Sequence, residues 1–273
     1  MRKKILILYH SGSGSTGMIG SVMGAMIEIR YDIDIIEMRP CLDLSKFPEY
    51  DLVILGFPTY YFRPPLSAME FVKELPDLKG KCFYIFTTYG LYSGNSIRIL
   101  SDALREKNGR IIGYTQIRGP ASDGVLLFPS VRLFCRYERY SDRKISKALS
   151  RISQFLLQGR EKEDMPRRRW YSPFTRIFKR QLDSIEYSQY RLNLRVIKER
   201  CTNCNICVKN CIRSCWARGD EHPSINTSNC EFCLKCVHNC PERAIIFNDK
   251  MMDRLRLDSK FYQKQKEILL NKI

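Results

Sequence analysis

The first 159 residues alternate short apolar runs with amphipathic stretches. Residues 5–9 and 52–56 are almost wholly apolar, which is typical of strands buried inside a parallel sheet. Residues 18–26, by contrast, repeat their apolar side chains at helical spacing. This alternation predicts an α/β fold built on an open, five-stranded parallel sheet. The expected strands are 5–9, 34–37, 52–56, 82–88 and 111–117, and the later expected helices are 66–75, 96–107 and one through 145–156.

Local signals indicate where these elements end. Pro76 stops the helix of residues 66–75. Ser96 is expected to cap the next helix, and Asn108-Gly109 to end it. Residues 118–140 are rich in aromatic and apolar side chains but fit neither pattern, so we expect a loop or an extension there.

The pattern changes after residue 159. Residues 160–191 are polar, basic and interrupted by Pro166 and Pro173, so we interpret them as a linker with some helix near 174–182. Residues 192–249 form a small cysteine-rich module, and the tail is expected to be helical around 260–270. The predicted divisions are therefore 1–159, 160–191, 192–249 and 250–273.

The chain contains 12 cysteines, and eight of them form two runs with the same spacing, C-x2-C-x2-C-x3-C. The runs repeat at a period of 29 residues, and no export signal precedes them, so metal binding is favoured over disulfides. Zinc is the alternative, but zinc sites use four ligands, usually as two separated pairs. The two runs are Cys201, Cys204, Cys207, Cys211 and Cys230, Cys233, Cys236, Cys240.

Both runs resemble those of bacterial ferredoxins. That resemblance implies two [4Fe–4S] clusters in which the fourth cysteine of each run ligates the other cluster. Cluster 1 would then use Cys201, Cys204, Cys207 and Cys240, and cluster 2 would use Cys230, Cys233, Cys236 and Cys211.

The two halves of this module also differ. Ile212 stands where the second run has Pro241, and Cys215 aligns with Ala244. Cys215 is either a spare ligand or, as we favour, a small buried residue. The cysteines of the N-terminal region are interpreted as core or loop thiols: Cys41, Cys82 and Cys135.

A glycine- and serine-rich loop, residues 11–17, follows the first expected strand and leads into a helix. Such a loop offers backbone N–H groups and hydroxyls to an anion at the positive end of the helix. The lysine of an ATP-binding P-loop is missing, and the loop matches the dinucleotide fingerprint poorly. His10, just before the loop, is expected to have a local structural role.

The same loop, read as Ser11-Gly-Ser13-Gly14-Ser15-Thr16, resembles the phosphate loop of flavodoxins. The resemblance implies that FMN binds there and that the loops after the third and fourth strands hold its ring, at the carboxyl edge where open α/β sheets bind ligands. The implied FMN-binding residues are Ser11, Ser13, Gly14, Ser15, Thr16, Pro58, Thr59, Tyr60, Tyr61, Phe62, Thr88, Tyr89, Gly90, Leu91, Tyr92 and Gly94.

Taken together, the chain resembles a flavodoxin–ferredoxin fusion: a flavodoxin-like FMN domain followed by a bacterial ferredoxin-like domain. The resemblance implies an electron-transfer protein that relays electrons between two [4Fe–4S] clusters and FMN and exchanges them with redox partner proteins. The alternative is a flavin-dependent reductase of a small organic substrate such as a quinone, with residues 118–140 forming a substrate pocket. The electron carrier is favoured, since no residue stands out as a general acid.

The net charge of +17 divides into +7 for residues 1–159, +6 for 160–200 and +4 for 201–273. The segment Arg167–Arg180 mixes cations with aromatic side chains. A solvated linker or interdomain packing is the favoured interpretation, and an anionic membrane surface or an acidic redox partner are the alternatives. Nothing resembles a nucleic-acid reader module. The short apolar run near the start is no signal peptide, so we expect a cytoplasmic protein that is at most peripheral to the membrane.

Overall fold

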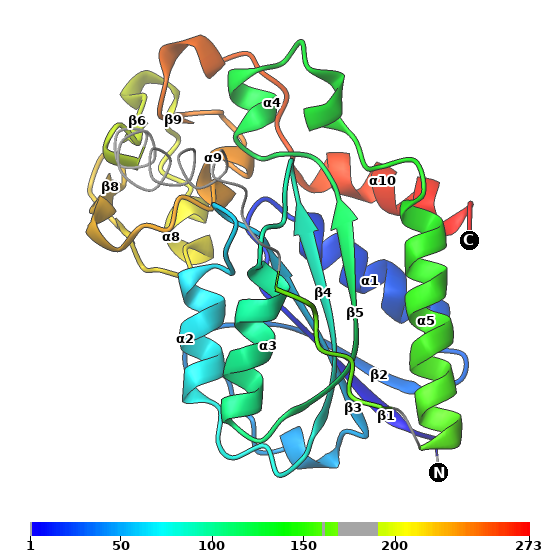
Figure 1. Ribbon diagram of the computed structural model, residues 1–273. Helices are drawn as coiled ribbons and strands as arrows, with labels where there is room; N and C mark the ends of the chain where they lie inside the picture. Colours follow the sequence, from blue (N-terminus) through cyan, green and yellow to red (C-terminus); the bar gives the residue numbers. More distant parts are fainter. Residues whose placement is uncertain (1, 160–161, 169–190) are drawn as a thin grey trace.

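The computed structural model describes residues 2–159, 162–168 and 191–273. Its centre is a parallel sheet of five strands in the order β2-β1-β3-β4-β5 (Figure 1). This strand order, 2-1-3-4-5, is that of the flavodoxin fold. The strands are β1 Lys4–Tyr9, β2 Asp32–Glu37, β3 Leu52–Pro58, β4 Cys82–Tyr89 and β5 Arg110–Arg118.

Helices cover both faces of the sheet because successive residues of each strand point to opposite sides. Ile5 and Ile7 of β1 belong to the core under α1 (Ser15–Ile27) and α5 (Ser141–Gln158). Leu6 and Leu8 belong to the core under α2 and α3 on the other face. Those two helices are α2 Leu66–Glu74 and α3 Ser96–Glu106.

The expected α/β fold and the five expected strands are confirmed, with strand ends shifted by at most two residues. The capping role predicted for Ser96 is wrong. Asn95 occupies the cap, Ser96 is the first helical residue, and its buried hydroxyl lies 2.8 Å from Thr59 Oγ1. A hydroxyl that bonds another side chain is not available to cap its own helix.

Residues 118–140 form an extension beyond β5, as expected. It contains α4 (Gly124–Leu127) and a short 3-10 turn, Arg132–Cys135. The Asp123 carboxylate accepts a 2.8 Å hydrogen bond from the N–H of Gly124, which starts α4. This extension lies above the carboxyl ends of the strands (Figure 1).

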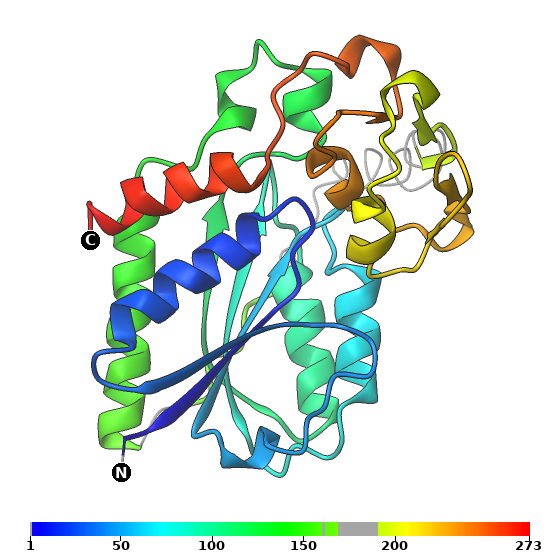
Figure 2. The same ribbon diagram turned by 180° about the vertical axis from the view of Figure 1, so that it is seen from behind.

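The C-terminal region is a small α+β unit at the same edge of the sheet (Figures 1 and 2). Two antiparallel pairs, β6–β9 and β7–β8, frame two short helices. The elements are β6 Arg195–Val196, α8 Ile206–Asn210, β7 Trp216–Ala217, β8 Ser224–Ile225, α9 Lys235–His238 and β9 Ile245–Ile246.

The chain then returns to the N-terminal domain through α10 (Ser259–Leu270), which lies alongside α1 (Figure 2). The predicted helical tail is therefore present, but it packs on the sheet domain instead of extending away from it. Tyr262 and Leu269 of α10 join the same hydrophobic core as α1. One continuous core thus connects the two halves of the chain.

Only the first part of the predicted linker is described. The backbone N–H of Asp164 donates to Ile111 O, and Arg98 donates to Pro166 O, so this part lies against β5 and α3. The expected helix near 174–182 and most of Arg167–Arg180 lie outside the described residues. Within the described ranges, no helix is long and apolar enough to cross a membrane.

Candidate functional site

A cavity of about 250 Å³ opens at the carboxyl edge of the sheet. Three loops line it: the one between β1 and α1, the one after β3 and the one after β4. These are the loops for which the sequence predicted FMN contacts. The predicted residues that line the cavity are Ser11, Ser13, Ser15, Thr16, Pro58, Thr59, Tyr60, Tyr61, Phe62, Thr88, Tyr89, Gly90, Leu91 and Tyr92.

Gly14 and Gly94, also predicted as FMN contacts, do not line this cavity. Gly14 has φ of 137°, and a Cβ there would lie 2.6 Å from the ring of Tyr262 in α10. Gly94 has φ of 55° and packs against Phe62. Both positions require glycine. A side chain at Gly14 would clash with Tyr262 of α10, and one at Gly94 would clash with Phe62 in the loop after β3.

The loop between β1 and α1 presents donors to the cavity without a cationic side chain. Gly14, at the start of α1, has no side chain that could cap the helix, and the N–H of Gly17 in the first turn donates to Ser11 Oγ at 3.3 Å. The helix dipole favours an anion at this end. Among the residues that line the cavity, Asp123 is the only Asp, Glu, Lys or Arg. A phosphate held here would therefore be bound by N–H groups and hydroxyls.

The hydroxyls of this loop are held in place by partners from distant parts of the chain. Thr16 Oγ1 lies 2.8 Å from Thr88 Oγ1, and Ser15 Oγ lies 2.7 Å from the hydroxyl of Tyr137. Ser13 Oγ lies 2.9 Å from the hydroxyl of Tyr262. Burial raises the pKa of Tyr262, so its hydroxyl stays protonated at neutral pH.

The loop after β3 has an unusual backbone. Tyr60 and Arg63 pair as a narrow bridge, and both residues of the turn between them, Tyr61 and Phe62, have positive φ. Non-glycine residues adopt this conformation at a cost, and such strain concentrates at ligand sites. The Phe62 ring packs edge-on against Tyr92 at 5.6 Å, so the loops after β3 and β4 support each other.

Part of the cavity wall lies outside the residues predicted to contact FMN, although residues 118–140 were predicted as a substrate pocket in the reductase alternative. It comes from Gly12 in the loop after β1, from the extension after β5 and from the C-terminal unit. The residues are Gly12, Pro120, Ala121, Ser122, Asp123, Gly124, Phe128, Phe134, Phe232 and Leu234. The aromatic content of residues 118–140 was one available signal. Another was that Phe232 and Leu234 stand where the first cysteine run has Asn203 and Asn205, so only the second loop has an apolar surface to bury.

The eight cysteines meet in two crossed groups. Cys240 lines one cavity together with the first three cysteines of its partner run, and Cys211 lines the other in the same way. The groups are Cys201, Cys204, Cys207, Cys240 and Cys211, Cys230, Cys233, Cys236. Across the described residues, no three His, Cys, Asp or Glu side chains come close enough to hold a single metal ion.

The two cysteine loops repeat each other in backbone conformation. Asn203, Asn205 and Ser214 have positive φ, and so do their counterparts 29 residues later: Phe232, Leu234 and Arg243. The N–H of Cys215 donates to Cys211 Sγ at 3.3 Å, and the N–H of Ala244 donates to Cys240 Sγ at 3.2 Å. The sulfur atoms of the two crossing cysteines, Cys211 and Cys240, therefore each accept a hydrogen bond from the N–H four residues later.

The donor set fits an iron–sulfur cluster. Burial raises the pKa of Cys207 to about 11, and burial also raises the pKa of Cys230, Cys233 and Cys236. A thiolate at these positions needs a compensating positive charge, which metal ligation provides. N–H donors to the sulfur atoms match the outer-shell contacts of such clusters.

Cys215 is buried and lines the second group's cavity. Burial raises the pKa of its thiol to about 12. The favoured interpretation of Cys215 as a small buried residue agrees with this position. The other cysteines differ in exposure: Cys41 is exposed, and Cys82 and Cys135 are half-buried.

Buried polar contacts join the C-terminal unit to the N-terminal domain. The carboxylate of Glu231 accepts hydrogen bonds from the N–H and hydroxyl of Ser67, and His10 Nε2 lies 3.2 Å from Glu231 Oε1. Burial acts to raise the pKa of Glu231, but the bonds from His10 and Ser67 outweigh it and leave that pKa lowered. The structural role expected for His10 therefore extends to the contact between the two halves of the chain.

His238 makes a second such contact. Its Nε2 lies 2.9 Å from Ser122 O, and its Nδ1 accepts a hydrogen bond from the N–H of Leu257. Burial lowers the pKa of His238 to about 3, so the ring is neutral and Nε2–H is the donor to Ser122. The helix α9 is thereby tied to the extension that lines the cavity.

Comparisons with known proteins give a curated relative and a set of solved structures. A polyferredoxin-like protein of Methanocaldococcus jannaschii, described as uncharacterised, is 32% identical over 60 residues. The match covers 22% of this chain and 26% of that protein, so the chain spans about a quarter of its relative's length. No protein-family model matches the chain.

The solved structures that match the chain include several flavodoxins. A flavodoxin from the domain Archaea is 18% identical, with a TM-score of 0.41 over 54% of this chain and 92% of its own. Flavodoxin 2 of Bacillus cereus is 22% identical, with a TM-score of 0.43 over 57% of this chain and 99% of its own. The flavodoxin fold of residues 2–159 follows independently from the order of its strands.

Proposed function

We propose that this chain is an electron-transfer protein that relays electrons between two [4Fe–4S] clusters and an FMN. The clusters carry single electrons, whereas FMN accepts one or two, so the chain would convert between one-electron and two-electron chemistry. We further propose that redox partner proteins, acidic ones given the net charge of +17, exchange electrons with it.

The fit of FMN to the cavity supports one half of this proposal. The cavity lies at the carboxyl edge of a flavodoxin-type sheet, offers the start of α1 to a phosphate, and is lined by aromatic side chains after β3 and β4. A Cβ on Gly12 would lie 2.0 Å from Tyr60 Oη and 2.7 Å from Cys233 O. Only a glycine therefore permits this wall of the cavity.

The crossed cysteine groups support the other half. Their spacing is that of bacterial ferredoxins, and the crossing is the arrangement that this resemblance implies. The relative from Methanocaldococcus jannaschii is named polyferredoxin-like, which agrees with iron–sulfur binding in this chain.

The observation that carries the proposal is that the two kinds of site share a wall. Phe232 and Leu234 lie between cysteines of the second run and also line the flavin-type cavity. Cluster 2 would thus be the one next to the flavin, and cluster 1, whose Cys204 is exposed, would be the outer one. A shared wall keeps the two kinds of site close together, which favours electron transfer between them.

Anaerobic purification followed by analysis of iron, acid-labile sulfide and flavin tests this function. We expect about eight irons and one FMN per chain. Replacing Cys236 by Ser should reduce the iron content and leave FMN bound. A wild-type protein that holds zinc instead of iron, or that binds no FMN when the cofactor is added, would contradict the proposal.

A second candidate function rests on the extension after β5. Phe128 and Phe134 line the cavity together with Asp123, so a small aromatic substrate could lie against the flavin there. This favours the alternative of a flavin-dependent reductase of a quinone-like molecule. Steady-state turnover with a soluble quinone would support the reductase, whereas a pure carrier should exchange electrons only with proteins.

A further inference from the structure

Two buried charges of opposite sign lie next to the two cysteine groups. Arg256 is 4% exposed, and Glu231 is 3% exposed. Buried charges of this kind are uncommon because removing them from water is costly. The burial of each charge therefore needs a specific explanation.

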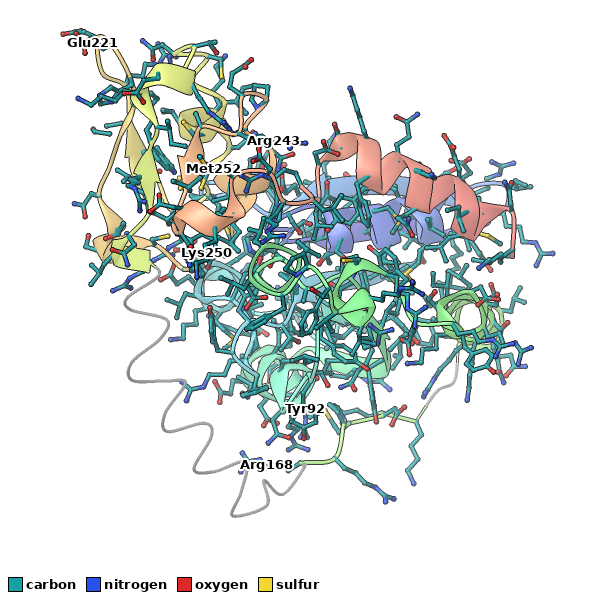
Figure 3. The ribbon with its side chains drawn as sticks, turned by 90° about the horizontal axis from the view of Figure 1, so that it is seen from above. Tyr92, Arg168, Glu221, Arg243, Lys250 and Met252 are labelled. Carbon is teal, nitrogen blue, oxygen red and sulfur yellow. The ribbon has the colours of Figure 1, made fainter. Side chains whose placement is uncertain are left out.

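Arg256 does not line the cavity of the first group but lies near its crossing cysteine, Cys240. The backbone N–H of the next residue, Leu257, donates to His238, which lies two residues before Cys240 in the chain. The guanidinium is close enough to Cys240, Arg243 and Arg200 for their charges to act on it. Figure 3 shows Arg243 on the side of the C-terminal unit that faces α10, with Glu221 at its outer tip.

The guanidinium of Arg256 also has unused donors. Its Nε, Nη1 and Nη2 atoms are all buried and have no hydrogen-bond partner within the described part of the chain. Burial, followed by the charge of Arg243, lowers the pKa of Arg256 to about 10, which leaves it charged at neutral pH. A buried, charged group with three free donors is expected to have an anionic partner.

Glu231 lies beside the second group. It sits between Cys230 and Cys233 in sequence and lines the same cavity as the four cysteines. Its carboxylate is held by Ser67 and His10, as described above. Arg213 also lines this cavity, but its guanidinium is already paired with Glu70.

We propose that these two side chains keep the clusters at different reduction potentials, with Arg256 raising that of cluster 1 and Glu231 lowering that of cluster 2. The inference rests on the proposed function. Reduction adds one negative charge to a cluster, and in a poorly solvated environment a nearby cation stabilises that charge while a nearby anion opposes it. The anionic cluster and its Cys240 ligand are the partner that the free donors of Arg256 lack.

The ranking gives the relay a direction. In the internal step, one electron leaves reduced cluster 2 and reduces oxidised cluster 1, and no proton or bond changes place. This step is downhill from the cluster next to the flavin cavity to the outer one. The end near the exposed Cys204 is then the side at which electrons leave.

The test is an anaerobic redox titration of the full chain, with the reduced clusters followed by EPR spectroscopy and the flavin by absorbance. Wild-type protein should show two cluster steps. Arg256→Met should lower the higher of the two reduction potentials by about 59 mV. For one electron this is about a tenfold change in the equilibrium constant. Arg256→Lys, which keeps the charge, should move it less, and Glu231→Gln should raise the lower step.

Arg254→Gln is the matched control, because Arg254 is two residues away and exposed. Solvent screens its charge, so we expect both steps to stay within about twofold of wild type. Equal shifts for Arg254→Gln and Arg256→Met, no shift for either buried residue, or a shift of the lower step by Arg256→Met would each overturn the inference. If Arg256→Met fails to assemble its clusters, the shift in Glu231→Gln decides.

The same samples separate this inference from the proposed function. Iron, sulfide and flavin contents of wild-type protein decide whether the clusters and FMN are present at all. A protein with full cofactor content and unshifted potentials in the variants would retain the proposed function and lose only the ranking.

Discussion

At the scale of single residues, Gly12 is a position where the two halves of the chain approach closely. Its backbone lies between the hydroxyl of Tyr60 and the carbonyl of Cys233. A side chain there would have to displace either the flavin-type loop or the cysteine loop.

We therefore expect Gly12→Ala to weaken FMN binding. Overpacking of this kind costs about 1–3 kcal/mol, which corresponds to roughly 5- to 150-fold in affinity. Quenching of flavin fluorescence during titration of apoprotein measures the change. Tyr60→Phe combined with Gly12→Ala should recover only part of the loss, because the Cys233 carbonyl remains 2.7 Å from the new Cβ. Wild-type affinity in Gly12→Ala would show that the loops are not in contact.

Tyr50 offers a pH-dependent test far from the cysteine groups. Its buried hydroxyl donates a 2.6 Å hydrogen bond to Asp34, and burial together with that bond raises its pKa to about 12. The folded state therefore holds the phenol proton between about pH 10 and 12, where the unfolded chain has lost it. The stabilisation is present below pH 10 and is lost as the pH rises.

We expect the wild-type protein to lose about 1–2 kcal/mol of unfolding free energy over this alkaline range through Tyr50. Tyr50→Phe should be less stable at neutral pH but lose less stability above pH 10. Urea unfolding at pH 9 and pH 11.5, followed by circular dichroism, gives the comparison. Identical pH slopes for the two proteins would contradict the assignment.

At the scale of elements, α10 links the end of the chain to the phosphate-type loop. Tyr262 of α10 is buried, and its hydroxyl lies 2.9 Å from Ser13 Oγ. Its ring also occupies the space that Gly14 leaves open. The helix thus holds the loop that would bind the phosphate.

A double-mutant cycle tests this link. Tyr262→Phe and Ser13→Ala should each cost about 1 kcal/mol of stability, and the double variant should cost less than the sum because both remove the same bond. FMN affinity should fall in parallel. Strictly additive losses in urea unfolding would mean that the two hydroxyls are not coupled.

The same helix shows what sequence can and cannot predict. The helical pattern of 260–270 was recognisable because periodicity is local. Its docking on α1 was not, since Ser13 and Tyr262 are 249 positions apart and only the folded chain brings them together. The capping prediction for Ser96 was wrong for a related reason. The cap signal is local in sequence, whereas the hydroxyl of Ser96 bonds Thr59, which lies in a distant loop.

The candidate site shows the same difference between local features, which the sequence reveals, and long-range contacts, which it does not. The resemblance to bacterial ferredoxins implied the crossed cysteine groups, because the spacing within each run is the one that those proteins use. The contacts of Glu231 with Ser67 and His10 could not be predicted, because each partner looks unremarkable in its own segment. The flavin loops were predicted, but the wall contributed by Phe232 and Leu234 required the docking of the two halves.

At the scale of the whole molecule, ion pairs supplement the buried contacts between the two halves. Lys235 in α9 lies 2.5 Å from Glu37 at the end of β2, and both side chains are 20% exposed. Arg213 pairs with Glu70 of α2 at the other side of the contact. These pairs help to fix how the C-terminal unit sits above the sheet, and with it the separation between the second cysteine group and the flavin-type cavity.

Reversing one charge of the Lys235–Glu37 pair should loosen this docking. In Lys235→Glu, two carboxylates face each other, so we expect faster hydrogen exchange at residues 231–234 and slower electron equilibration between clusters and flavin after rapid mixing with a reductant. The reciprocal variant, Glu37→Lys with Lys235→Glu, restores opposite charges and should recover both properties, with a coupling energy of about 1–3 kcal/mol.

The control is Glu49→Gln, whose partner Lys4 lies within the N-terminal domain and whose loss should leave electron equilibration unchanged. Iron and flavin contents are expected to stay constant in all of these variants. An unchanged rate of electron equilibration in Lys235→Glu, despite faster hydrogen exchange at residues 231–234, would therefore mean that the relay does not depend on this docking.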